Sequence, residues 1–175
     1  MLSWLKTRSD GRRKARELYG AVVAQARNAE FYQRLGVADT PEGRYELIVL
    51  HLIFVLERLG AEGASTEQAR RETLEAFVAD MDDSIRELGA GEMSIPRKVK
   101  KAAGGVYERA AVFRAAIADA DPTVLQAWIA KFVLQGGGSD DDLAALASYV
   151  RRCSDLLSTQ PASDIVAGRV AFGDI

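Results

Sequence analysis

The segment from residue 32 to residue 59 constrains the fold of this chain more than any other part of it. It begins with residues typical of a helix end and continues through a turn in which Asp39 or Thr40 can cap a new helix. From Leu47 to Leu56 it is then strongly apolar. A helix that is apolar on nearly all of its sides is stable only with other helices packed around it. The sequence therefore predicts a helical bundle built around residues 41–59.

Helical periodicity also runs through most of the remaining sequence. Apolar residues recur every three or four positions, and glycines or prolines interrupt this pattern at intervals typical of helix ends. The expected helices end near Leu35, run from Pro41 to about Leu59, from Ser65 to Leu88, from about Ser94 to Ile117, from Asp121 to Val133 and from Ser139 to Leu157. Because no segment shows the alternating pattern of a strand, the chain is predicted to be all-α.

These segments predict a single-domain bundle of about six helices, in which the last two form a helical hairpin packed on the main bundle. A length of 175 residues is enough for one such domain but short for two. The expected organisation is a basic amphipathic N-terminal arm over residues 1–16, a helical domain over residues 17–160 and a C-terminal tail without regular period over residues 161–175.

Some residues predict how individual helices begin or weaken. Ser65 with Gln68 has the spacing of a capping box, and Ser139 precedes three aspartates that favour the positive end of a helix dipole. Gly104 and Gly105 lie inside an otherwise helical pattern, where each weakens the helix by about 1 kcal/mol relative to alanine. Either another part of the molecule closely approaches this backbone, or the turn is soft.

The first sixteen residues are strongly basic, although the whole chain has a formal charge of −2. Six cations against one aspartate give this arm a net charge of +5, so the rest of the chain carries −7. Apolar side chains at its start can enter a lipid interface while the cations meet anionic headgroups. The predicted membrane-surface residues are Leu2, Trp4, Leu5, Lys6, Arg8, Arg12, Arg13 and Lys14. The alternative is a frayed terminus that is merely basic.

Neither a secretory signal nor a membrane span is predicted. The apolar start is too short for a signal peptide, and the apolar run of residues 47–56 is well below the roughly 18 residues that a spanning helix needs. The chain is therefore expected to be soluble or peripheral to a membrane.

Few residues offer chemistry for catalysis or for binding a metal ion. His51 is the only histidine and Cys153 the only cysteine, so neither a histidine cluster nor an internal disulfide can form. His51 is expected to be a mostly buried ring with one satisfied nitrogen, or a groove-lining residue, rather than a catalytic base. Phosphate loops, nucleophile elbows and zinc spacings are missing from the sequence, which therefore predicts no enzyme, no cofactor and no metal site.

Two charged clusters allow more than one interpretation. Residues 80–83 hold three aspartates, which form either a solvated and ion-paired surface, a docking site for a basic segment, or paired catalytic or cation-binding carboxylates. Among them Asp82 is one helical turn from Arg86 and can pair with it. Residues 97–101 hold four cations at the start of a helix, where positive charge opposes the dipole. That run indicates either contact with phosphate or simple solvation.

A longer pattern of residues resembles the ubiquinol–cytochrome c chaperone family. It runs through Leu18-Tyr19, Gln25-Ala26-Arg27, Phe31-Tyr32, Gly36-Val37, Asp39-Thr40, Gly43-Arg44, Glu46, Leu50-His51 and Arg58-Leu59, and resumes at Phe77, Asp80-Met81-Asp82, Arg86-Glu87, Gly89, Gly91, Val99-Lys100, Tyr107, Arg109 and Phe113. The closing Gly168-Arg169-Val170-Ala171-Phe172 is similar to bacterial members. Glu92-Met93 and Glu108 depart from the pattern, because the family tends to have Asp-Leu and a glycine there.

The resemblance implies a non-catalytic assembly factor that binds newly made cytochrome b and assists biogenesis of the ubiquinol–cytochrome c reductase complex. It implies a cytoplasmic protein peripheral to the inner membrane, with the ribosome as a candidate further partner. The basic arm makes an anionic membrane surface a candidate partner as well, and the few aromatic residues beside residues 97–101 predict no specific nucleic-acid partner.

Charged and polar residues that match the family pattern are the candidates for partner binding, because packing alone does not require them. They are Arg44, Glu46, His51, Asp80, Asp82, Arg86, Glu87, Lys98, Lys100, Tyr107 and Arg109. The alternative is that they form an internal network, in which Arg44 or Arg86 ties helix ends together through carboxylates.

Two other function classes compete with this hypothesis. One is a helical RNA- or ribosome-binding module built on the arm and residues 97–101, which predicts strongly salt-dependent binding to RNA. The other is a small hydrolase or metal enzyme that uses the carboxylates of residues 80–83 and requires a divalent ion. The sequence leaves open the oligomeric state and the need for a partner subunit.

Overall fold

The structure is a computed structural model that describes residues 2–175, with side chains described from residue 9 onward. Its helices are α1 (Leu2–Ala26), α2 (Ala29–Gln33), α3 (Pro41–Ala61), α4 (Glu67–Glu87), α5 (Ile95–Ala118), α6 (Pro122–Phe132), α7 (Asp140–Thr159) and α8 (Ala162–Val166). Two short 3-10 turns, η1 (Gly63–Ser65) and η2 (Glu92–Ser94), precede α4 and α5. Residues 2–175 contain no strand, and the prediction of an all-α bundle is confirmed.

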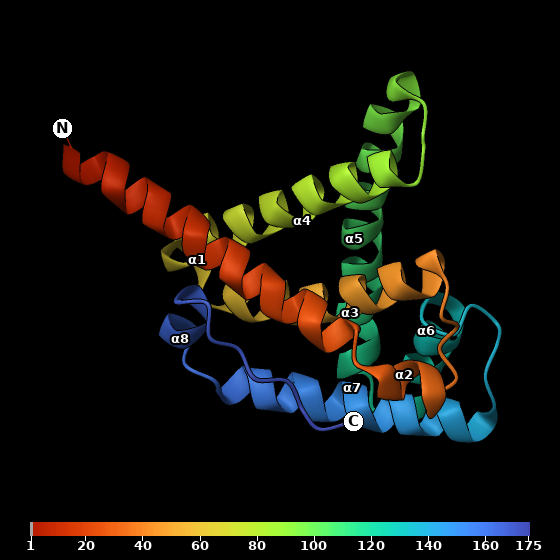
Figure 1. Ribbon diagram of the computed structural model, residues 1–175. Helices are drawn as coiled ribbons and strands as arrows, with labels where there is room; N and C mark the ends of the chain where they lie inside the picture. The colour runs from red at the N-terminus through yellow and green to blue at the C-terminus, as the bar shows by residue number, and fades with distance from the viewer. Residues whose placement is uncertain (1) are drawn as a thin grey trace.

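Helix α3 is the centre of the fold. Helices α1, α4, α5, α7 and α8 all contact it, and Figure 1 shows it as the orange-to-yellow helix in the middle of the molecule. Every residue from Leu47 to Leu56 is buried. The segment predicted to need helices around it is therefore surrounded by them.

The start of α3 depends on a tight local turn. Of the two candidate caps, Thr40 takes the role, because its hydroxyl accepts a hydrogen bond from the backbone N–H of Gly43 at 3.1 Å. Asp39 instead pairs with Arg44 at 2.7 Å. A Cβ atom on Gly43 would lie 2.0 Å from the carbonyl oxygen of Ala38, so only glycine fits this first turn.

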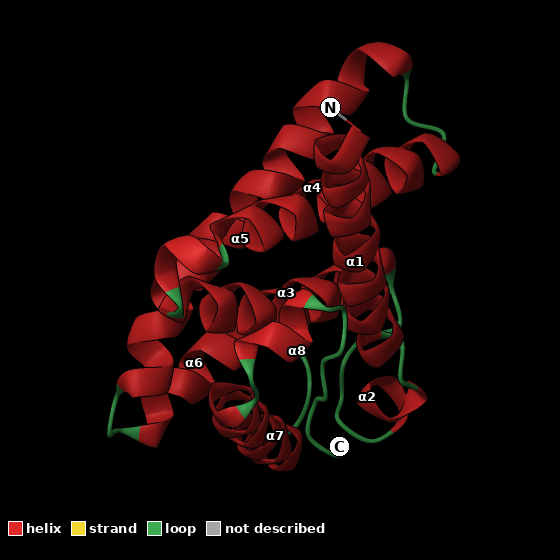
Figure 2. Cartoon of the chain, turned by 90° about the vertical axis from the view of Figure 1, so that its left-hand side faces the viewer, coloured by secondary structure: helices red, strands yellow, loops and turns green. Residues whose placement is uncertain are grey.

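The helices around α3 reach out in different directions. Helices α4 and α5 come together at the turn that joins them, and this end projects from the rest of the molecule in both ribbon views (Figures 1 and 2). Helix α7 lies on the opposite side, and the C-terminal residues return alongside it (Figure 1). Helix α6 contacts both α5 and α7. Whether α6 and α7 form the hairpin expected from the sequence stays a prediction.

The single helix predicted to end near Leu35 is in fact two helices. Helix α1 ends at Ala26, and Asn28 begins α2 by accepting a hydrogen bond from the backbone N–H of Glu30 at 3.1 Å. Periodicity does not reveal this break, because α2 again buries an apolar residue, Phe31. A local cap therefore divides a segment whose apolar pattern is continuous.

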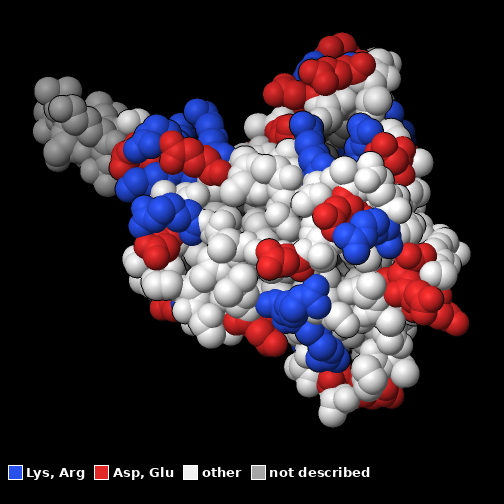
Figure 3. All heavy atoms as spheres, turned by 60° about the horizontal axis from the view of Figure 1, so that its bottom comes forward, with Lys and Arg blue, Asp and Glu red and all other residues white. Residues whose placement is uncertain are grey.

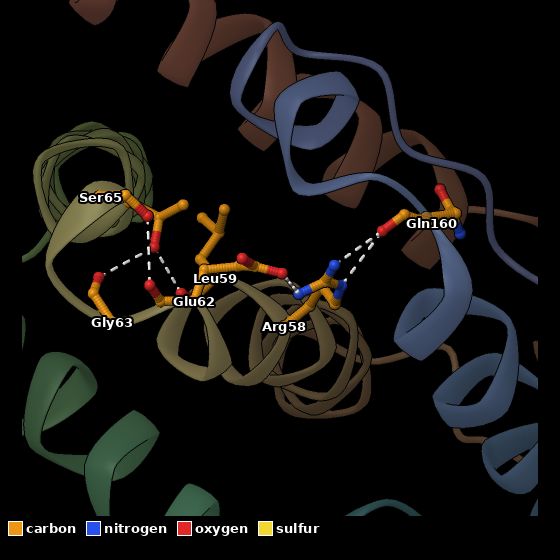
Figure 4. A network of polar contacts seen from close by, with 7 residues as sticks. Arg58, Leu59, Glu62, Gly63, Ser65 and Gln160 are labelled. Atoms are coloured by element: carbon orange, nitrogen blue, oxygen red, sulfur yellow. Dashed lines mark hydrogen bonds and ion pairs between the residues drawn. The ribbon is translucent and has the colours of Figure 1, made fainter.

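The predicted capping box at Ser65 and Gln68 is wrong. The Ser65 hydroxyl donates to the carbonyl of Glu62 at 3.1 Å, and α4 begins only at residue 67. The neighbouring Thr66 hydroxyl donates to the carbonyl of Leu59 at 2.5 Å. Both hydroxyls therefore satisfy carbonyl groups at or just after the end of α3 rather than N–H groups at the start of α4, and Figure 4 shows the contact of Ser65.

Arg58 connects the end of α3 to the C-terminal part of the chain (Figure 4). Its Nε and Nη2 donate to the carbonyl of Gln160 at 3.2 and 2.9 Å, and its Nη1 pairs with Glu62 at 2.7 Å. The Gln160 side chain in turn binds the backbone of Ala171 in both directions, at 2.6 and 2.9 Å. The tail expected to lack regular structure is thus held in place, and it contains the short helix α8.

His51 belongs to a buried chain of hydrogen bonds that links α1, α3 and α7. The amide of Gln25 donates to the Tyr149 hydroxyl at 3.0 Å, that hydroxyl lies 2.6 Å from Nε2 of His51, and Nδ1 lies 2.7 Å from the carbonyl of Leu47. Because a carbonyl oxygen can only accept, Nδ1 carries the proton and Nε2 accepts from Tyr149. The ring is completely buried, as expected from the sequence, but both nitrogens are satisfied rather than one.

The burial of His51 predicts how stability depends on pH. Burial lowers the pKa of His51 to about 4, whereas an exposed histidine has a pKa near 6.5. Between these values the unfolded chain binds a proton that the folded chain excludes, so we expect the free energy of unfolding to decrease as the pH falls from 6.5 to 4. The contribution of this ring at the lower limit is roughly 3 kcal/mol.

Urea unfolding at several pH values measures this effect, with His51→Gln as the non-titrating control. The control removes the contribution of other groups, since both proteins share all remaining titratable side chains. A wild-type pH dependence equal to that of the variant would contradict a neutral, buried His51.

Candidate functional site

A large open groove lies between α3, α4 and α5. Its volume is about 1170 Å³, and a second, smaller hollow of about 210 Å³ lies between α3, α5 and α7. Ile48, Met81 and Ile85 supply apolar surface to the groove. Charged side chains also line it: Arg27 of the turn after α1, Glu42, Arg44 and Glu46 of α3, Asp80 and Glu87 of α4, and Lys98, Lys101, Glu108 and Arg109 of α5.

An ion pair between Glu46 and Arg109 joins α3 to α5 at the inner end of this groove. The two carboxylate oxygens accept from Nε and Nη2 of the guanidinium at 2.6 and 2.5 Å, and the side chains are only 9% and 16% exposed. The guanidinium also lies over the ring of Phe132, 4.9 Å from its centroid. Burial raises the pKa of Glu46, and the hydrogen bonds from Arg109 oppose that rise.

Tyr45 fixes the adjacent wall of the groove. Its hydroxyl donates to the carbonyl of Ala102 at 2.9 Å, and a Cβ atom on Gly105 would lie 2.6 Å from the same hydroxyl oxygen. The close approach expected at the glycine pair therefore occurs at Gly105. Gly104 differs, because a Cβ atom there would have no neighbour within 4 Å and the residue is exposed to the groove.

The opposite wall is held by a contact between α1 and α4. Tyr19 is a buried residue, only 7% exposed, and its hydroxyl donates to the carboxylate of Asp80 at 2.6 Å. Asp82 pairs with Arg86 at 2.7 Å, as the sequence predicts, and Arg86 also pairs with Glu92 at 2.8 Å. The acidic cluster is therefore an ion-paired and hydrogen-bonded helix surface over most of its length.

The candidate partner-binding residues divide into three groups. Those that line the groove are Arg44, Glu46, Asp80, Glu87, Lys98 and Arg109. Those on the surface outside it are Asp82, Arg86, Lys100 and Tyr107. His51 alone is fully enclosed in the core. As the alternative expected, Arg44 and Arg86 each tie a helix to an adjoining turn, through Asp39 and Glu92 respectively.

Sequence reasoning missed several residues of the groove. Arg27 belongs to the family pattern, Lys101 to the basic run and Tyr45 to neither, and no local pattern assigns any of them to a site. Glu108 departs from the family pattern, so the resemblance assigns it no role. Their meeting depends on how α3, α4 and α5 cross, and that is not a property of any one segment.

The two lysines that α5 contributes to the groove form no ion pair within the described part of the chain. Neither Lys98 nor Lys101 has an ion-pair partner among the side chains described from residue 9 onward. Both are exposed and both lie in the first two turns of α5, where the helix dipole does not favour positive charge. The cluster therefore fits an anionic group that comes from outside this chain.

The N-terminal arm is only partly open to structural description. The side chains of Leu2, Trp4, Leu5, Lys6 and Arg8 lie outside the described residues. Arg13 pairs with Asp10 and with Glu17, and Lys14 pairs with Asp10 at 3.1 Å, while Arg12 is exposed. Figure 3 shows the resulting mixture of basic and acidic side chains beside the grey region. Acidic neighbours on α1 thus offset part of the positive charge of the arm.

Neither a metal cluster nor a membrane span occurs in the described part of the chain. Among those side chains, no group of three or more His, Cys, Asp or Glu residues could hold a metal ion. Over the described residues, no helix combines the length and the apolar character that crossing a membrane requires.

Comparisons with known proteins place the chain among chaperones. Residues 33–172 match the model of a family described as Ubiquinol-cytochrome C chaperone. The chain is also similar to the crystal structure of the Cbp3 homolog from Brucella abortus, with 30% sequence identity and a TM-score of 0.86 over 99% of this chain and 96% of that one. A comparison with curated proteins found no match. The family match extends through the closing segment that ends at Phe172.

The ion pair at the inner end of the groove yields a stability prediction. Arg109→Met leaves the Glu46 carboxylate buried without its cation, and we expect the free energy of unfolding to fall by about 3 kcal/mol. The double variant Glu46→Gln, Arg109→Met removes both charges and should recover most of this loss. Urea unfolding of the wild type and of both variants provides the comparison. An equal loss in the single and double variants would show that packing, rather than the unpaired charge, is responsible.

Proposed function

The chain belongs to the ubiquinol–cytochrome c chaperone family, and we propose that it acts as a non-enzymatic assembly factor that binds cytochrome b during biogenesis of the ubiquinol–cytochrome c reductase complex. The family match and the likeness to the Cbp3 homolog support an assembly role for that complex. Beyond this assembly role, we propose that the protein binds cytochrome b, and we propose where on the protein and where in the cell this binding occurs.

The observation that carries the proposal is the convergence of candidate partner-binding residues on one groove. Arg44 of α3, Asp80 and Glu87 of α4 and Lys98 of α5 are far apart in the sequence but line the same surface. Charged residues on an exposed apolar groove contribute little to packing, whereas they can orient a bound partner. We therefore propose that this groove is the surface that contacts cytochrome b.

The distribution of cations on α5 favours a protein partner over RNA. Lys98 and Lys101 line the groove, whereas Lys100 lies outside it, so the basic run of residues 97–101 is divided between two sides of the helix. A phosphate backbone is normally followed by a continuous basic track with aromatic platforms for the bases. Tyr107 is exposed but is not part of the groove lining. Contact with the ribosome stays a prediction.

We also propose that the protein works at the cytoplasmic face of the inner membrane, in peripheral contact with it. Cytochrome b is inserted in that membrane, and a chaperone that binds it has to approach the lipid surface. The basic arm supports this proposal, since each lysine or arginine near an anionic surface contributes about 1 kcal/mol of attraction.

Capture of the client tests the main proposal. The tagged protein is crosslinked in native membranes and purified, and its partners are identified by mass spectrometry. We expect cytochrome b to be enriched over other abundant respiratory subunits. Lys98→Glu reverses a charge inside the groove and should reduce this capture. Lys100→Glu makes the same change on the same helix outside the groove and should leave it unchanged.

Two results would contradict this proposal. Recovery of ribosomal components without cytochrome b would favour the RNA-facing alternative. Equal losses of cytochrome b in the two lysine variants would place the contact outside the groove.

Vesicle co-sedimentation tests the proposed membrane contact. We expect more binding to vesicles that contain anionic phosphatidylglycerol than to neutral phosphatidylcholine vesicles, with weaker binding at higher salt. Lys6→Glu with Arg8→Glu should weaken binding to the anionic vesicles by roughly tenfold or more, because two attractive charges become repulsive. Equal binding to both kinds of vesicle would contradict an electrostatic role of the arm.

A further inference from the structure

The face of α5 that borders the groove carries charged side chains and one exposed glycine. Lys98, Lys101, Gly104 and Glu108 follow one another at intervals of three or four residues, and all line the groove. Between the charged positions, Gly104 exposes the backbone of the helix. Nothing in the chain itself explains this glycine, because a Cβ atom there would meet no neighbour within 4 Å. Gly105, by contrast, is required by the adjacent Tyr45 hydroxyl.

A glycine in a helix interior lowers the stability of that helix, so its presence at an open position calls for a reason outside the free chain. Small residues let the backbones of two helices approach closely. Gly104 lines a groove to which Ile48, Met81 and Ile85 contribute apolar surface, so a helix that approached Gly104 would also contact these side chains. The bare backbone and the apolar surface therefore face the same space.

The size and the borders of the groove indicate what can fill it. Its volume of about 1170 Å³ exceeds the range of roughly 300–1,000 Å³ that is usual for small-molecule sites. Helices α3, α4 and α5 form its walls, and no strand edge exists over residues 2–175 to which an extended peptide could add. Of the common modes of peptide recognition, an amphipathic helix laid into a groove is the one that a partly apolar groove between helices fits best.

The charges on the α5 wall specify the polar side of such a helix. Lys98 and Lys101 have no ion-pair partner among the described side chains, and they stand one turn apart on the side of Gly104 that is nearer the α4–α5 turn. A carboxylate on the bound helix would compensate both ammonium groups when the groove closes over it. Charge complementarity of this kind determines orientation and partner choice more than overall affinity.

We propose that the groove receives one amphipathic α-helix of the client, packed closely against Gly104 and bearing an acidic side chain opposite Lys98 and Lys101. The proposal depends on the proposed function only for the identity of the client, cytochrome b. To that function it adds three points: the bound segment is a helix, it carries an acidic side chain opposite Lys98 and Lys101, and it packs against Gly104.

Substitution at Gly104 separates folding from binding. Gly104→Leu places a side chain in the groove at a position where the free chain has room, so we expect an equal or higher melting temperature. Gly20→Leu is the matched control, because Gly20 is also an exposed helical glycine with nothing within 4 Å of an added Cβ, but lies on α1 outside the groove. In the crosslinked pull-down, Gly104→Leu should reduce the yield of cytochrome b at least about tenfold, and Gly20→Leu should not.

The form of the bound segment is read from crosslinks. A photoreactive benzoylphenylalanine replaces Ser84, Leu88 or Glu108 in turn, which leaves Lys98 and Lys101 in place, and the crosslinked positions in cytochrome b are mapped by mass spectrometry. Positions that follow one another at intervals of three or four residues, in a segment that includes an acidic residue, support the proposal. Positions at intervals of two, or scattered over several segments, overturn it.

The outcomes distinguish this inference from the function on which it rests. If wild-type protein captures cytochrome b and Gly104→Leu captures it equally, the helix proposal fails while the proposed function stands. If wild-type protein captures no cytochrome b, the proposed function itself fails.

Discussion

The burial of α3 on every side is the constraint from which the rest of this structure follows. Residues 47–56 leave no exposed face, so the surrounding helices must cover all of it. Polar groups on such a helix need partners inside the protein, since an unpaired buried group is strongly unfavourable. His51 finds Tyr149 and a backbone carbonyl, and Glu46 finds Arg109. No buried side-chain nitrogen or oxygen among the described residues lacks a partner.

This same constraint produces the groove. Helices α4 and α5 both pack against α3, but they meet each other at a turn that projects beyond it (Figures 1 and 2). The inner end of the space between them is fixed, because Arg109 joins α5 to α3 and Asp80 joins α4 to α1. Toward the turn the walls are exposed, and Leu88 there is 71% accessible to solvent. A fixed base with an exposed outer end suits the binding of a segment longer than the groove itself.

The sequence predicts those features that depend on neighbouring residues and misses those that depend on how helices cross. Thr40, Asp121 and Ser139 begin helices as expected, because a cap and its N–H group lie within three residues of each other. The break at Asn28 was hidden because the apolar pattern continues across it. For the site, the family pattern supplied Arg44, Asp80 and Glu87, but the pairing of Glu46 with a residue 63 positions later has no local signal.

The two adjacent glycines of α5 show why one pattern in a sequence can have two causes. At Gly105 the cause lies within the chain, since the Tyr45 hydroxyl occupies the place of a side chain. At Gly104 the chain leaves that place empty, so any selective reason for the glycine must come from outside. Lys98 and Lys101 follow the same logic, because both remain unpaired on the groove wall. Exposed charges on an empty groove help to keep the protein soluble. Those charges form ion pairs only when a client with opposite charges binds. Gly104 and the two lysines, which are unpaired among the described side chains, have no role within the free protein, and they are therefore the residues from which we infer the form and the charge of the bound segment.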